Sequence, residues 1–275
     1  MRPSARAPYW VVGLVGLLAL LWTVPVLGIF ITSVRPYSET AMGWWRVDEV
    51  TFTLSAWKTV WSKYPLAEGL AASLKITLAS TALTVALSPA AAYAFHYLKF
   101  PFRRVSLIVL VNAFVLPQQV IVIPLFTLWR QFGLIDNVWA VILPYVGMSF
   151  AWSVFLAKNF LDDFPGELIE AAKVDGCGPI ATYFFVVLPN SLTSLAAMAI
   201  LQFLWAWNSL LIPLLFLRTD EPMPVLLSRI AGTYEPNLDQ QSAVAILTMV
   251  VPLVVFLALQ RHFVAGGLSR MGLKG

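Results

Sequence analysis

The sequence predicts an all-α, polytopic membrane protein with six transmembrane helices, and its composition, its long apolar runs and the placement of its basic residues all indicate this class. Of the 275 residues, 59% are hydrophobic and 12% are charged, and the mean hydropathy of +0.79 is too high for a water-soluble domain. Backbone polar groups must be satisfied internally in hydrocarbon, so unbroken apolar runs favour helices. A β-barrel would instead show alternating polarity, which the sequence lacks.

The spans follow from length, because a helix needs about 20 mainly apolar residues to cross a bilayer. Six segments meet this requirement: residues 9–32, 72–95, 105–128, 138–157, 191–217 and 242–260. The first is too long for the apolar core of a secretory signal and has no clear cleavage site, so we expect a retained helix. The sequence shows no convincing internal repeat. We therefore expect one transmembrane domain over residues 1–275.

Basic residues in the short loops predict the orientation. They lie before the first span, after the second and after the last: Arg2, Arg6, Lys99, Arg103, Arg104, Arg261, Arg270 and Lys274. Cytoplasmic loops carry an excess of Lys and Arg, so both termini are expected in the cytoplasm, and counting spans places the loop 158–190 there too. The net charge of +4 does not indicate nucleic-acid binding, because the basic residues border spans instead of forming a patch.

Metal and redox chemistry have few candidate residues. Cys177 is the only cysteine, and the two histidines, His96 and His262, lie far apart in the sequence. Nothing in the spacing brings together the Ser, His and Asp of a catalytic triad. We expect no metal site and no cofactor bound by this chain.

The loop over residues 158–190 is predicted to contain a short helix. Asp162 and Asp163 precede Pro165, which suits a helix start because negative charge is favourable at the positive end of the helix dipole. The following GELIEAAKVDG would form about three turns, with Ala172 and Gly176 on one face. Such a small-residue face would allow close approach of another protein. A plain connecting loop is the alternative, although about thirty residues is long for one.

Residues within this loop resemble the EAA signature of permease subunits in bacterial ATP-binding-cassette (ABC) importers. The match comprises Glu170-Ala171-Ala172, Gly176 and the run Val186-Val187-Leu188-Pro189, in which valine replaces the usual isoleucine. Other segments resemble the carbohydrate-uptake, maltose-type branch of that family: Ala91 to Phe95, Ile142 to Tyr145, Trp207-Asn208 and Gln260 to Leu268. The resemblance thus extends over nearly the whole chain and implies the type I ABC importer permease fold in an inner membrane.

The resemblance also implies a mechanism. The segment around Glu170 would be a coupling helix seated in a dimer of cytoplasmic ATP-binding subunits, which would bind ATP and Mg. A second homologous permease subunit would complete the pore, and an extracytoplasmic sugar-binding protein would deliver the sugar. The chain would be a transport subunit and not an enzyme. The implied coupling residues are Glu170, Ala171, Ala172, Asp175, Gly176, Leu188 and Pro189.

Polar and tryptophan residues inside the spans are candidates for a sugar pathway that crosses the membrane lipid within the protein. Amides exchange hydrogen bonds with hydroxyls, and aromatic faces stack on sugar rings. These residues are Asn112, Gln118, Gln119, Trp205, Trp207, Asn208 and Ser209. Hydrogen bonding between helices is the alternative explanation. An importer permease for a non-sugar solute, and an intramembrane enzyme acting on a lipid-linked substrate through acidic residues 162–175, are the alternative functions.

Overall fold

The structure is a computed structural model that describes residues 8–48, 50–113, 115–232 and 237–272. These residues form helices and connecting segments without a β-strand, which confirms the predicted all-α class. Arg2, Arg6 and Lys274, which contributed to the predicted orientation, lie outside the described residues. The elements in chain order are α1 (Tyr9–Ser33), α2 (Tyr37–Thr40), α3 (Ser55–Lys63), α4 (Leu66–Tyr97), α5 (Arg103–Ala113), α6 (Gln118–Gln131), α7 (Trp139–Asp162), α8 (Gly166–Val174), α9 (Pro179–Thr182), the π-helix η1 (Tyr183–Val187), α10 (Leu188–Asn190), α11 (Leu192–Asn208), α12 (Leu211–Phe216), α13 (Met223–Ala231) and α14 (Leu238–Gly272).

Within the described part of the chain, four helices are each long and apolar enough to cross a membrane: α1, α4, α7 and the Leu238–Gln260 part of α14. Two further pairs pass the same test jointly, α5 with α6 and Pro179–Asn190 with α11. These pairs bend by 101° and 75°. The count rises to six, the number predicted, if each bent pair is one span.

Two of the predicted spans are each divided into two helices close to a proline. Residues 105–128 divide between α5 and α6, because Pro117 is the N-cap of α6 in an extended conformation. Residues 191–217 divide at Ser209 into α11 and α12. Pro213 lacks the N–H that a continuous helix would bond to the carbonyl of Ser209, and the chain is extended at Ser209, with φ −73° and ψ 126°.

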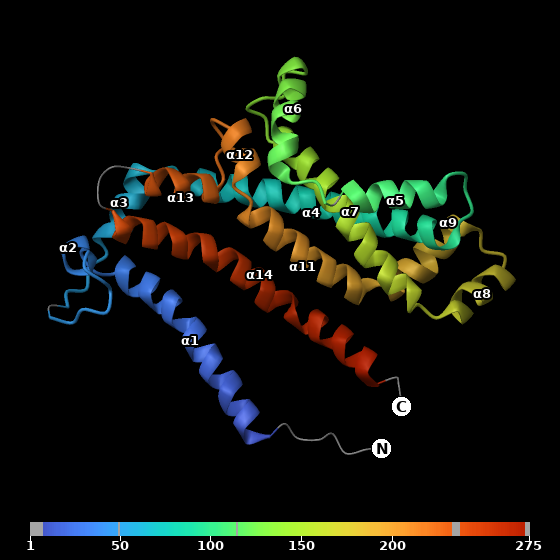
Figure 1. Cartoon of the computed structure of the whole chain (residues 1–275), viewed down its shortest axis with the longest axis horizontal. Coiled ribbons are helices and arrows are strands. Elements are labelled where there is room, and N and C mark those ends of the chain that lie inside the picture. The colour runs from blue at the N-terminus through green and yellow to red at the C-terminus, as the bar shows by residue number, and fades with distance from the viewer. Residues whose placement is uncertain (1–7, 49, 114, 233–236, 273–275) are drawn as a thin grey trace.

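The long helices run between two ends of an elongated bundle (Figure 1). α2, α3 and α13 gather at one end, here called the α3 end, while α8 and α9 lie at the opposite end, here called the α8 end. α4 is the central helix and packs on both α7 and α11, and α14 packs between α11 and α1. One apolar cluster joins α4, α7 and η1 near the α8 end, so the base of the predicted coupling segment belongs to the core.

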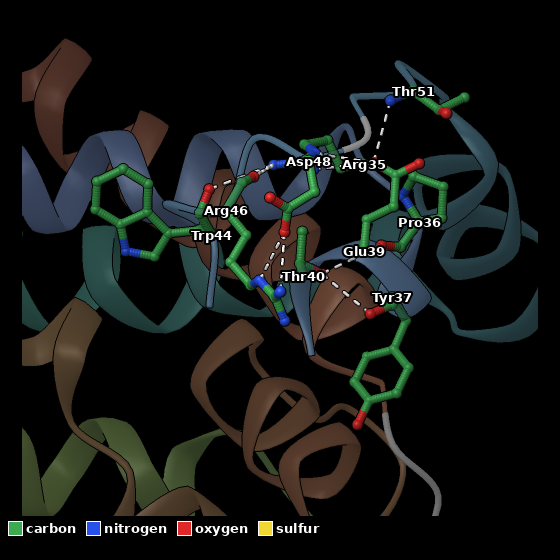
Figure 2. Close-up of polar contacts among 9 residues, drawn as sticks. All are labelled: Arg35, Pro36, Tyr37, Glu39, Thr40, Trp44, Arg46, Asp48 and Thr51. Carbon is green, nitrogen blue, oxygen red and sulfur yellow. Dashed lines mark hydrogen bonds and ion pairs between the residues drawn. The ribbon is translucent and has the colours of Figure 1, made fainter. Parts of the chain in front are cut away.

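A polar cluster fixes the segment that follows α1 (Figure 2). The buried Arg35 forms an ion pair with Glu39 at 3.0 Å and donates to the main-chain carbonyls of Trp44 and Arg46. Glu39 also accepts a hydrogen bond of 3.1 Å from the N–H of Thr51. These five residues, the Arg35 cluster, close the chain from 35 to 51 into a compact cap at the α3 end.

Candidate functional site

The predicted coupling helix exists as α8, although its start differs from the prediction. Pro165 is the N-cap, and Glu167 is the acidic residue in the first turn. Asp162 does not cap α8, because it is the last residue of α7 and its carboxylate binds Lys158 at 3.0 Å and His96 at 3.1 Å. Lys173 lies in the last turn, where a positive charge is favourable.

Gly176 ends α8 in a Schellman motif. Its φ of +81° lies in the left-handed region that glycine adopts without strain. The N–H of Gly176 donates to the carbonyl of Lys173 and the N–H of Cys177 to that of Ala172, at 3.1 and 2.9 Å, as this motif requires. Gly176 therefore sets the direction in which the chain leaves the helix.

The exposed face of α8 is not the one predicted. Ala172 is only 5% exposed and packs with Ile169 toward the protein core, while Gly176 lies beyond the helix end, so the two form no common surface. The opposite side carries the exposed Leu168, Ala171 and Val174, the last of which is 87% exposed. We call these three residues the exposed α8 face, and it is small and apolar enough to contact another protein.

The remaining predicted coupling residues have different environments. Glu170 and Asp175 are exposed on α8 and at its C-cap. Pro189 is exposed in α10, whereas Leu188 is half-buried against the core cluster at the α8 end. The π-helix η1 precedes these two residues, and the chain then bends by 75° into α11. π-helical turns are rare and often mark functional sites.

Within the membrane interior, the structure brings Trp205 and Ser209 together with a residue outside the predicted set, Tyr145. The Tyr145 and Trp205 rings pack edge to face at 5.1 Å, and the Tyr145 hydroxyl donates to the carbonyl of Ser209 at 3.3 Å. A cavity of about 10 Å³ adjoins Tyr145 and Ser209 and is also lined by Ser73 and Thr77. This volume is below the roughly 300–1,000 Å³ of small-molecule sites, so the cavity is too small to enclose a sugar.

The other predicted pathway residues contribute little to this cavity. Trp207 lines the cavity edge but is fully buried, and its indole donates to the carbonyl of Thr248, which commits it to the packing of α11 on α14. Asn208 is exposed, as are Asn112 and Gln119, and Gln118 is half-buried. The side-chain amides of Asn112 and Asn208 each donate to a carbonyl one turn earlier in their own helix. Each of these two amides is therefore bonded within its own helix.

Sequence reasoning missed a buried polar stripe on α4 and its surroundings. The stripe has helical spacing, which was a signal available in the sequence: Ser73, Thr77, Ser80, Thr84 and Ser88. Thr84 hydrogen-bonds Ser149 of α7 at 2.9 Å. On α11, Gln202 is fully buried, and neither atom of its amide has a hydrogen-bond partner among the described residues.

The candidate metal ligands remain dispersed. Among the described residues, no group of three or more His, Cys, Asp or Glu side chains could hold a metal ion. The acidic residues of the loop are spread around α8, and Asp162 is already bound to Lys158 and His96.

Comparison with known proteins defines the class. Residues 82–266 match the family of binding-protein-dependent transport system inner membrane components. A probable ABC transporter permease of Pyrococcus horikoshii is 32% identical over 90% of this chain and 92% of its own length. The osmoprotective compounds uptake permease of Synechocystis is 34% identical over 92% and 88%, and the trehalose transport system permease of Mycobacterium tuberculosis is 30% identical over 99% of both chains. The chain therefore belongs to this family and is a multi-pass inner-membrane transport component.

Solved structures agree in fold. A chain of a bacterial ABC transporter involved in alginate import superposes with a TM-score of 0.76 over 93% of this chain and 96% of its own length, at 21% identity. A chain of the MetNI methionine ABC transporter superposes with a TM-score of 0.59 over 76% and 97%, at 17% identity. The likeness confirms the ABC importer permease fold predicted from the sequence.

Proposed function

We propose that this chain is one permease subunit of an ATP-driven importer that carries a neutral sugar, glycoside or sugar-like osmolyte by alternating access. The observation that supports the proposal is the position of α8: it presents the exposed α8 face outward while its other side is anchored in the core. A movement imposed on α8 from outside would therefore reach the spans directly. Relatives named for trehalose, lactose, α-glucoside and arabinooligosaccharide transport support a carbohydrate cargo.

In this proposal, the other subunits of the transporter are partner proteins. ATP and Mg bind to a dimer of cytoplasmic ATP-binding subunits, whose closure moves α8. The exposed amides Asn112, Gln119 and Asn208 face a second, homologous permease subunit, and the pore lies between the two. An extracytoplasmic sugar-binding protein docks at the α3 end. Both termini and the loop 158–190 are cytoplasmic.

The test is uptake by the complete complex in proteoliposomes. Radiolabelled trehalose, lactose, an α-glucoside and an arabinooligosaccharide would be compared with glycerol-3-phosphate and methionine as non-sugar solutes. We expect ATP-dependent uptake of at least one sugar, and its loss when the exposed Val174 is replaced by Asp. Uptake of the non-sugar solutes alone would replace the carbohydrate assignment with the alternative cargo. ATP-independent uptake, or none, would contradict the proposed function.

A further inference from the structure

Two residues in the last turns of α4, Tyr93 and His96, contact the two residues that flank the coupling segment, which we define as residues 163–182. This segment contains α8 and α9 and lies between the last residue of α7 and the first residue of η1. Its entry is marked by Asp162 and its exit by Tyr183. Both of these residues contact α4 within five residues of its end at Tyr97.

The entry contact is polar. Nδ1 of His96 lies 3.1 Å from Oδ1 of Asp162, which also accepts from Lys158 within α7. The side chains of His96 and Asp162 are 26% and 44% exposed, and ion pairs this exposed contribute little to stability. The effect of the pair is geometric, because it fixes the end of α7 to the end of α4 three residues before the N-cap of α8.

The exit contact is apolar and buried. The ring of Tyr183 packs on that of Tyr93 with centroids 5.4 Å apart, and both residues are less than 10% exposed. Tyr93 also packs on Tyr97, whose ring contacts His96 edge to face at 4.4 Å. The entry and exit contacts thus form one continuous patch on α4.

The body of α8 belongs to the same assembly. Ile169 is 3% exposed and lies in the core cluster that contains Tyr93 and Tyr183. Close-packed groups of this kind move together, because deforming them would open voids. The connection to α11 is different: the chain passes through the π-helix η1 and bends by 75°. Close packing and the His96 contact therefore join the coupling segment to α4. The chain path to α11 is bent and irregular, although Met198 of α11 packs in the same cluster.

We propose that Tyr93 and His96 are positioning residues that make the coupling segment and the α8 end of α4 one rigid unit, so that ATP-driven displacement of α8 enters the membrane through α4. The proposal rests on the proposed function and deepens it by naming the span that moves with α8. Removing the His96 contact would leave the rate of ATP hydrolysis intact but would lower the amount of sugar transported for each ATP hydrolysed.

The experiment measures sugar uptake and ATP hydrolysis in the same proteoliposomes, with the radiolabelled sugar that the wild-type complex takes up from the panel above. We expect His96→Ala to lower the ratio of sugar transported to ATP hydrolysed. His96→Asn keeps a donor near the position of Nδ1 and should restore the ratio. Lys158→Ala is the matched control, since Lys158 binds Asp162 only within α7, and it should leave the ratio unchanged.

A cross-link separates positioning from a general loss of stability. In a Cys177→Ser background, the pair His96→Cys and Asp162→Cys should lower the ratio, and a short bifunctional thiol reagent that joins the two thiols should restore it. An unchanged ratio in His96→Ala would overturn the proposal, as would a cross-link that fails to restore it. Failure of the proposed function would look different: the wild-type complex itself would then show no ATP-driven uptake.

Discussion

The hydroxyl of Tyr145 donates a hydrogen bond of 3.3 Å to the main-chain carbonyl of Ser209. In a continuous helix this carbonyl would accept from the N–H of residue 213, but that residue is a proline and has none. Tyr145 is buried and Ser209 is half-buried, so the bond supplies a donor to a carbonyl at the break between α11 and α12 that has lost its helical partner. A side chain of α7 thus stabilises the irregular point of the fifth span.

We therefore expect Tyr145→Phe to destabilise the protein by about 0.5–1.5 kcal/mol, the net contribution of a typical hydrogen bond. Thermal unfolding of the detergent-solubilised chain measures the change. Tyr64→Phe is the control, since Tyr64 is half-buried near the α3 end and distant in sequence from the break. Equal unfolding temperatures for the two variants would show that the Tyr145 bond has no effect on stability.

The left-handed conformation of Gly176 gives a second prediction. A Cβ at either Gly176 or Gly178 would meet no atom within 4 Å, so the two sites differ in backbone conformation and not in space. We expect Gly176→Ala to cost about 1–2 kcal/mol and to lower transport, because an L-residue is strained at a φ of +81°. Gly178→Ala should be nearly neutral, since its φ is −69°. Comparable losses in both variants would argue against a conformational role.

The Arg35 cluster predicts a pH dependence. The hydrogen bond from the N–H of Thr51, aided by the charge of Arg35, holds the pKa of Glu39 below its usual value of 4.5. A lowered carboxyl pKa stabilises the folded form above the unfolded value, and this contribution is lost as the pH falls through the folded pKa. Hydrogen exchange over residues 35–51, corrected for intrinsic rates, should therefore accelerate below about pH 4.5. Glu39→Gln should exchange faster at neutral pH and lose this dependence. An unchanged pH profile in that variant would contradict the prediction.

The sequence predicted the class, the helical composition and the position of the coupling helix, because these depend on local apolar runs and on one motif. It did not predict which face of α8 is exposed. Leu168 and Ile169 are both apolar, and only the packing of Ile169 with Tyr183 shows which side is buried. Hydropathy located the spans 105–128 and 191–217, but it does not show that each is divided into two helices near Pro117 and Pro213. The contact of His96 with Asp162 joins residues 66 positions apart, which no local pattern indicates.

Gln202 provides the last prediction. Its amide is fully buried on α11 and has no hydrogen-bond partner among the described residues, a state that costs about 1–3 kcal/mol. We expect Gln202→Leu, which keeps a similar volume, to raise the unfolding temperature, and the exposed Gln119→Leu to leave it unchanged. If the amide finds its partners in another conformation of the transport cycle, the same variant will also lower ATP-dependent uptake, because it stabilises one conformation against the other. A lower unfolding temperature for Gln202→Leu would mean that the amide already stabilises the conformation described here.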